Sequence, residues 1–176
     1  MSILVCPLSK VEEMIDAHVP ERIVSVLDPG STFPDSGLTY QGRHLRLSFH
    51  DLHEPVEGQV MPSTRDIDRL LEFLAGWPRT RPILAHCRAG IGRSPATAYI
   101  AACLHNPKTP ELVVAAALRR VSPHARPNET LVGLADRAMG RGGMMCRAIV
   151  QTGSNLPWFP FDQGEPFEMP SEFDRT

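Results

Sequence analysis

A cysteine and two arginines lie within one short, glycine-containing stretch of the sequence, residues 85–94 (AHCRAGIGRS). The stretch follows a short apolar run, residues 82–85, and precedes an alanine-rich segment with helical spacing. A loop that leads from a strand into a helix presents free backbone N–H groups and the positive end of the helix dipole, and both attract an anion. The sequence therefore indicates an anion-binding loop that carries its own thiol.

The small and charged residues of this loop each have a chemical use. Gly90 and Gly92 permit the unusual backbone angles that a nest of N–H donors requires. Arg93 can add a planar guanidinium that matches two oxygens of a phosphate. The same positive field would hold Cys87 as the thiolate, which is the nucleophilic form. One loop can thus bind a tetrahedral dianion and supply the atom that attacks it.

The pattern His86-Cys87-x5-Arg93-Ser94, with Gly90 inside it, resembles the signature of the cysteine-dependent protein tyrosine and dual-specificity phosphatases. The resemblance covers residues 22–142, where the segments 122–128 (SPHARPN) and 134–143 (LADRAMGRGG) are similar to compact bacterial members. It implies a phosphatase-like α/β fold and hydrolysis of phosphate monoesters through a covalent cysteinyl-phosphate. No metal or other cofactor is implied, because the loop supplies the electrostatic stabilisation itself.

The resemblance also implies a role for each residue of the loop. Cys87 is the nucleophile, and Arg93 clamps the phosphoryl oxygens. Ser94 donates to the thiolate and helps it leave, while His86 braces the loop without transferring a proton. The main-chain N–H groups that cradle the phosphate belong to Arg88, Ala89, Gly90, Ile91, Gly92 and Arg93. The alternative for Cys87 is a small buried apolar residue, and the alternative for the Arg88 side chain is simple exposure to solvent.

A tyrosyl or alkyl oxygen leaves poorly unless a general acid protonates it. The family carries an aspartate for this purpose on a separate upstream loop, and we assign that role to Asp51. It follows the third expected strand, and in a parallel βαβ unit that strand and the cysteine strand end at the same edge of the sheet. The alternatives are the other acids near these elements: Glu54, Glu57, Asp28, Asp66 and Asp68.

Short apolar runs that alternate with helical patterns predict the elements that position this loop. We expect strands over residues 3–6, 22–27, 44–49 and 82–86, and helices after the caps Ser9 and Ser63 and over residues 95–105, 110–121, 128–140 and 143–151. This order predicts an α/β fold, with a small central parallel sheet of about four strands flanked by helices on both faces. The expected phosphatase domain is residues 1–152.

The composition of the chain indicates which partners and which cellular location to expect. The chain has 176 residues, 42% hydrophobic and 22% charged, with a net charge of −2, so neither nucleic acid nor an anionic membrane surface is expected as a partner. No apolar stretch approaches the roughly 20 residues that span a bilayer. Four cysteines without CxxC spacing and the lack of a signal-peptide pattern favour a cytoplasmic location. His50 and His53 have no third ligand at useful spacing, so we predict no metal site.

Residues 153–176 differ from the rest of the chain, since they are rich in aromatic, proline and acidic residues. A purely solvating tail would contain fewer aromatics. We expect Trp158, Phe159 and Phe161 to dock on the domain or on a second subunit, with the stretch after Gly164 looser. The alternative is a disordered end.

The predicted substrate is a phosphorylated protein, phosphotyrosine included, or a small phosphomonoester. Phosphoinositide-directed relatives carry lysines inside the loop, whereas this loop has Arg88, Ala89 and Ile91. The alternatives are a phosphoinositide or small-molecule phosphatase that uses the same loop, a sulfurtransferase of the rhodanese type, and a phosphate-binding module without catalysis. Rhodanese loops reach their arginine one residue sooner, and non-catalytic modules have usually lost the cysteine or the arginine.

Overall fold

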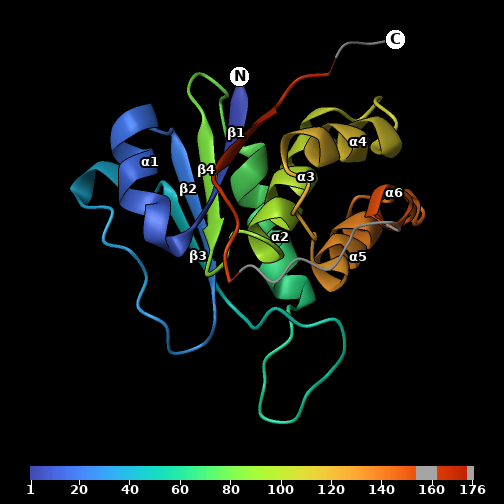
Figure 1. The fold of residues 1–176 in the computed structure, drawn as a ribbon, viewed down its shortest axis with the longest axis horizontal. Coiled ribbons are helices and arrows are strands. Elements are labelled where there is room, and N and C mark those ends of the chain that lie inside the picture. Colours follow the sequence, from blue (N-terminus) through green and yellow to red (C-terminus); the bar gives the residue numbers. More distant parts are fainter. Residues whose placement is uncertain (154–161, 174–176) are drawn as a thin grey trace.

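The structure is a computed structural model that describes residues 1–153 and 162–173. Its strands are β1 (Ser2–Pro7), β2 (Arg22–Leu27), β3 (His44–Ser48), β4 (Ile83–Cys87) and β5 (Phe167–Pro170). Its helices are α1 (Val11–His18), α2 (Thr64–Ala75), α3 (Arg93–His105), α4 (Glu111–Val121), α5 (Glu129–Ala138) and α6 (Met144–Gly153), with short 3-10 turns at Leu8–Lys10 and Leu38–Tyr40. Helix α1 lies on one face of the central sheet, and α2 to α6 lie on the other (Figure 1).

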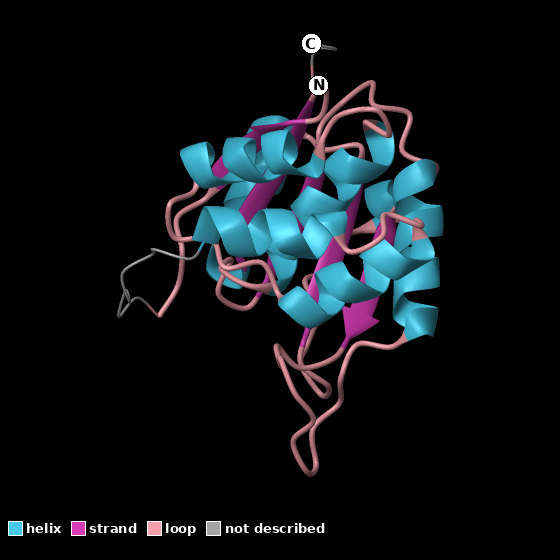
Figure 2. Cartoon of the chain, turned by 90° about the vertical axis from the view of Figure 1, so that its right-hand side faces the viewer, coloured by secondary structure: helices cyan, strands magenta, loops and turns pink. Residues whose placement is uncertain are grey.

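The sheet has the strand order β3-β2-β4-β1-β5 within these residues. The four strands expected from the sequence are confirmed and are mutually parallel, so β2, β3 and β4 all end at one edge. Strand β4 lies between β1 and β2, so Cys87 lies at the centre of the row of strand ends. Figure 2 shows the helical layer in front of this sheet.

Helix α3 forms the centre of the main core. Its residues from Arg93 to Cys103 are all buried, between the sheet and helices α2, α4 and α5. A helix that is buried on every side needs small or apolar residues all round, and the alanines of this segment provide them. The first turn of α3 is therefore held rigidly where it meets the end of β4.

The two predicted serine caps differ in outcome. Ser63 caps α2 as expected, since its hydroxyl accepts from Asp66 N at 3.3 Å and its own N–H donates to the Asp66 carboxylate at 2.9 Å. The prediction for Ser9 is wrong. A 3-10 turn precedes α1, the helix begins at Val11, and the Ser9 hydroxyl donates to Gln163 Oε1 at 2.9 Å.

The C-terminal segment contains a strand that the sequence did not predict. Strand β5 pairs antiparallel with β1, and Ser171 N donates to Met1 O at 2.9 Å. The expected looseness after Gly164 is wrong, because this pairing with a distant strand orders the segment. Trp158, Phe159 and Phe161 lie outside the described residues. No helix in residues 1–153 and 162–173 is long and apolar enough to cross a membrane.

Candidate active site

The loop between β4 and α3 contains two glycines that serve different purposes. Gly90 has a φ of +73°, and a Cβ there would lie 2.8 Å from Pro7 N, so both the backbone angle and the space demand glycine. Gly92 has a φ of −106°, which other residues adopt, so the expectation of an unusual angle there is wrong. A Cβ on Gly92 would instead lie 2.1 Å from Asp51 Oδ2. Gly92 therefore makes room for the Asp51 carboxylate.

The Cys87 sulfur is buried and accepts two hydrogen bonds. Gly90 N lies 3.2 Å from the sulfur, and the Ser94 hydroxyl lies 3.1 Å from it. Ser94 belongs to the first turn of α3, so the sulfur lies at the N-terminal end of this helix. Both donors and the helix dipole would stabilise negative charge on the sulfur.

Arg93 is held between the ends of β2 and β3. Its side chain is only 4% exposed, and Nη1 donates to Asp28 Oδ1 at 2.8 Å and to Phe49 O at 2.6 Å. Its Nε is buried without a hydrogen-bond partner among the described residues and lies 3.9 Å from Asp51 Oδ2. The guanidinium thus has a fixed position and an unused donor.

Asp51 lies over the loop and is positioned by Asn128. Its Oδ1 accepts from Asn128 Nδ2 at 2.7 Å, and its side chain is 36% exposed. Asn128 is fully buried, caps α5 by accepting from Leu131 N at 2.8 Å, and donates its own N–H to Gly92 O at 3.2 Å. Asn128 was not among the residues predicted for the site. An asparagine just before a helical segment signals a cap, but not a contact with an acid far away in the sequence.

The other acids considered for this role differ in where they lie relative to the site. Asp28 is in the site, bonded to Arg93. Glu54 and Glu57 are exposed in the long loop between β3 and α2, which protrudes from the domain (Figure 1). Asp66 is engaged in the cap of α2, and Asp68 is exposed on the same helix.

His86 belongs to a chain of hydrogen bonds beneath the loop, which runs from buried His86 and Ser25 to half-buried His44 and Ser36. Its Nε2 bonds to the hydroxyl of Ser25, which lies 2.6 Å from His44 Nε2, and His44 Nδ1 lies 2.8 Å from the Ser36 hydroxyl. Burial, with a smaller effect of His44, lowers the pKa of His86 to about 3. Burial and Arg46 lower the pKa of His44 to about 4. Both rings are therefore neutral at physiological pH, as a bracing role requires.

The sequence analysis did not single out Ser25 and His44. Ser25 is the polar residue within the apolar strand run RIVSVL, and the register of β2 on β4 places it opposite His86. A polar residue in a buried strand needs a hydrogen-bond partner. That signal exists in the sequence, but the partner depends on which strands are neighbours.

Carbonyl groups of the loop are bonded to three other segments. Arg88 O accepts from Leu8 N at 3.2 Å, Ala89 O from Gly164 N at 2.7 Å, and Ile91 O from Arg126 N at 2.8 Å. The side chain of Arg88 is exposed. Segments from both ends of the chain thus hold the backbone whose N–H groups are predicted to cradle phosphate.

Two of the remaining cysteines are buried core residues. Burial raises the pKa of Cys6 and of Cys103 to about 12, and both are core residues, as expected. Cys6 packs in the small cluster beside α1, whereas Cys87 belongs to the main core on the other face of the sheet. In the part of the chain that the structure describes, no group of three or more His, Cys, Asp or Glu residues is arranged to hold a metal ion.

Similarity to known proteins is found at the level of structure. No family model matches the sequence, and no curated protein matches it. The human tyrosine phosphatase-like serine/threonine/tyrosine-interacting protein superposes with a TM-score of 0.56 at 17% identity, over 78% of this chain and 87% of that one. DUSP15 gives 0.55 at 17% identity, over 87% and 91%. The chain has the tyrosine phosphatase fold. PTPMT1 in complex with PI(5)P shares it, with a TM-score of 0.55 at 12% identity, over 82% and 91%.

The tyrosine phosphatase fold confirms the fold class predicted from the sequence. Its members here include one described as an interacting protein and one, from Cydia pomonella, described as a phosphatase. The fold alone therefore does not decide between catalysis and binding. The side chains of the loop have to carry that argument.

Proposed function

We propose that the chain is a phosphatase that hydrolyses phosphate monoesters of proteins, phosphotyrosine included, through a cysteinyl-phosphate intermediate. The observation that carries the proposal is the Cys87 sulfur, which accepts from Gly90 N at 3.2 Å and from the Ser94 hydroxyl at 3.1 Å at the start of a buried helix. A cysteine kept only for packing would not need two donors aimed at its sulfur. Arg93 and Asp51 complete the set that phosphoryl transfer requires.

In the first step the Cys87 thiolate attacks phosphorus, an S–P bond forms, and the P–O bond to the leaving group breaks. The guanidinium of Arg93 and the N–H groups of the loop hold the three equatorial oxygens, on which charge is spread in the transition state. Asp51 donates its proton to the leaving oxygen. The closeness of its carboxylate to Gly92 and its hydrogen bond from Asn128 support this role.

In the second step a water molecule attacks phosphorus and the S–P bond breaks, which releases inorganic phosphate. The Asp51 carboxylate takes a proton from the water, so the group that acted as an acid now acts as a base. Ser94 donates its hydrogen bond to the departing thiolate and stabilises it as a leaving group. The enzyme returns to its starting protonation state.

The test is hydrolysis of p-nitrophenyl phosphate and phosphotyrosine peptides by the purified chain. Cys87→Ser should abolish turnover and keep affinity for phosphate, because the cradle remains while a hydroxyl is a poor nucleophile. Vanadate should inhibit the wild type, and a chelator should leave it active. Cys146→Ser, at a half-buried thiol on α6, is the matched control and should keep activity.

Three results would reject the proposal. They are full activity in Cys87→Ser, loss of wild-type activity on chelation, and transfer of sulfur from thiosulfate to cyanide in place of phosphate release. The last result would support the rhodanese-type alternative. Phosphate binding without turnover in the wild type would support the non-catalytic module.

A further inference from the structure

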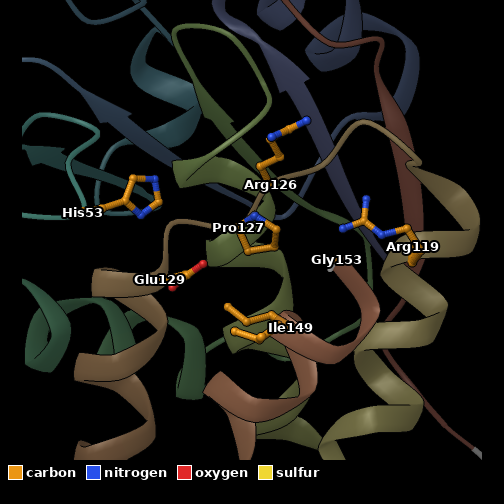
Figure 3. A pocket seen from close by; sticks show the side chains of 8 residues that line it. His53, Arg119, Arg126, Pro127, Glu129, Ile149 and Gly153 are labelled. Atoms are coloured by element: carbon orange, nitrogen blue, oxygen red, sulfur yellow. The ribbon is translucent and has the colours of Figure 1, made fainter. Parts of the chain in front are cut away.

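A cavity of about 270 Å³ lies beside the catalytic loop, among α4, α5, α6 and the segment that precedes α5. His53, Arg119 and Arg126 line it on one side, and Pro127, Ile149 and Val150 supply an apolar surface. Figure 3 shows the three basic side chains in the upper part of the view and Ile149 in the lower part. The cavity therefore has a cationic wall and an apolar wall.

The walls of this cavity are bonded directly to the candidate active site. Arg126 N donates to Ile91 O in the catalytic loop at 2.8 Å, and Thr130 Oγ1 donates to His53 O at 3.3 Å. His53 is two residues after Asp51 in the same loop. The walls of this cavity are thus continuous with the backbone of the catalytic loop and with the loop that carries Asp51.

Arg119 is held in a fixed position on the cationic wall. Arg119 donates through Nε to Thr152 O at 3.2 Å and through Nη1 to Pro123 O at 2.8 Å and Ala125 O at 2.9 Å. Its Nη2 borders the cavity, since a Cβ on Gly153 would lie 3.6 Å from it. Burial, and then the charge of Arg126, lower the pKa of Arg119. Among the described residues that line the cavity, Glu129 is the one acid beside the two arginines.

We propose that this cavity is a second anion subsite, which receives an acidic side chain of a phosphopeptide while its phosphorylated residue occupies the catalytic loop; the inference rests on the proposed function. The acidic group is a glutamate or a second phosphorylated residue, since each joins an anion to a carbon stem. The anion would approach Arg119 and Arg126, and the stem would pack on Ile149 and Val150. An inositol phosphate has an oxygen on every ring carbon and would leave that apolar wall against polar groups.

The test compares two phosphotyrosine peptides that differ only in having Glu or Gln on either side of the phosphotyrosine. The wild type should show a kcat/KM about tenfold higher for the Glu peptide, mainly through KM, as expected for a charge-assisted contact. Raising the salt concentration should reduce this ratio, because exposed charges are screened. Arg126→Gln should bring the ratio close to one, and a ratio is unaffected by any general loss of activity.

Matched variants keep the test decisive. Arg120→Gln removes the same charge from the exposed neighbour of Arg119 on α4 and should keep the preference for Glu. Val150→Glu adds a carboxylate at a side chain that is 52% exposed and should remove the preference even if Arg126→Gln does not fold. Circular dichroism melts check that each variant is folded.

Each possible result decides something. Equal kcat/KM for the two peptides in the wild type, or a preference that survives both Arg126→Gln and Val150→Glu, overturns the subsite. A soluble phosphoinositide that is hydrolysed better than both peptides, and loses this advantage in Arg126→Gln, overturns the peptide assignment. Failure to hydrolyse p-nitrophenyl phosphate rejects the proposed function alone. The same peptide pair is then compared by fluorescence anisotropy, where equal affinity overturns the subsite.

Discussion

The two sides of the catalytic loop are supported by different kinds of group. On the side where β2 and β3 end, Arg93 contacts Asp28 and Asp51, and both carboxylates are partly exposed, at 30% and 36%. Beneath the loop, His86 and Ser25 are fully buried and neutral. The carboxylates of the site thus face solvent, while the histidine that holds the loop does not titrate near neutral pH. Changes on the two sides should therefore have different signatures, in rate on the charged side and in stability on the neutral side.

Replacing Arg93, which contacts both carboxylates, should have the largest effect. Arg93→Lys should lower kcat by about 10³–10⁵-fold, because a point charge cannot reproduce a two-pronged hold on the equatorial oxygens. Steady-state kinetics on p-nitrophenyl phosphate measures this loss. Arg88→Ala is the comparison, since its side chain is exposed, and it should be mild. Equal losses of kcat at the two arginines would contradict the proposal that Arg93 alone holds the phosphoryl oxygens through its side chain.

The next effect separates the two carboxylates. Asp51→Asn should slow cleavage of phosphotyrosine by about 10²–10⁴-fold, the usual range for a positioned general acid. With an aryl phosphate whose phenol is already acidic, departure needs little help, and the loss should be far smaller. The measurement is kcat against the pKa of the leaving phenol. A uniform loss over all leaving groups would show that Asp51 has a binding or folding role, and Glu54 would be the next acid to examine.

A smaller and uniform effect is expected for the other carboxylate. Asp28→Asn keeps a hydrogen-bond acceptor for Arg93 Nη1 but removes the negative charge at 2.8 Å. Arg93 also donates to Phe49 O, so it should shift only slightly and kcat/KM should fall about tenfold. The plot of kcat against leaving-group pKa should keep the wild-type slope. A slope that changes as in Asp51→Asn would mean that Asp28 takes part in the proton transfer.

The neutral side should respond in stability more than in rate. Ser25→Ala leaves buried nitrogens of His86 and His44 without their partner, so the free energy of unfolding should fall by about 1–3 kcal/mol. In the wild type, the pKa values of about 3 and 4 lie below the ordinary value of 6.5. The unfolded histidines therefore take up protons first, so the stability they contribute is complete above pH 6.5 and is lost as the pH falls to about 4 for His44 and about 3 for His86.

Urea unfolding at several pH values measures this dependence. His44→Asn should make the loss of stability between pH 6.5 and pH 4 less steep, because one of the two suppressed ionisations is gone. His18→Asn, at an exposed position on α1, is the control and should keep the wild-type slope. A slope that is unchanged in His44→Asn would show that this buried pair does not set the acid limit of the fold.

The parts of the site that could be predicted are those governed by local sequence or by a topological rule. Cys87 ends β4, and Arg93 and Ser94 begin α3, so one short strand–loop–helix segment carries all three residues. The rule that parallel strands end at the same edge predicts that Asp51 emerges on the side of Cys87, and its carboxylate lies beside Gly92. Its role as an acid remains part of the proposal.

The parts that could not be predicted depend on pairs of segments far apart in the chain. The local sequence around Asn128 predicts only a helix cap. The packing of α5 against the loop that carries Asp51 brings the Asn128 amide to the Asp51 carboxylate. Gly92 reads as a flexible residue, although its use is to leave space. The sequence of β5 has only a weak strand pattern. A short strand at the edge of a sheet is stabilised mainly by its pairing with the neighbouring strand, here β1.

The pairing of β5 with β1 also sets an order of events during synthesis on the ribosome. The two strands come from opposite ends of the sequence, and the hydroxyl of Ser171 bonds to Met1 O, 170 residues away. Strand β1 is synthesised before β5, and the backbone N–H and C=O groups on its outer edge stay unpaired until residues 167–170 are available, which leaves this edge open to association with other chains. The bond from Gly164 N to Ala89 O also forms only then. The support of the catalytic loop is thus completed only after the loop itself has been made.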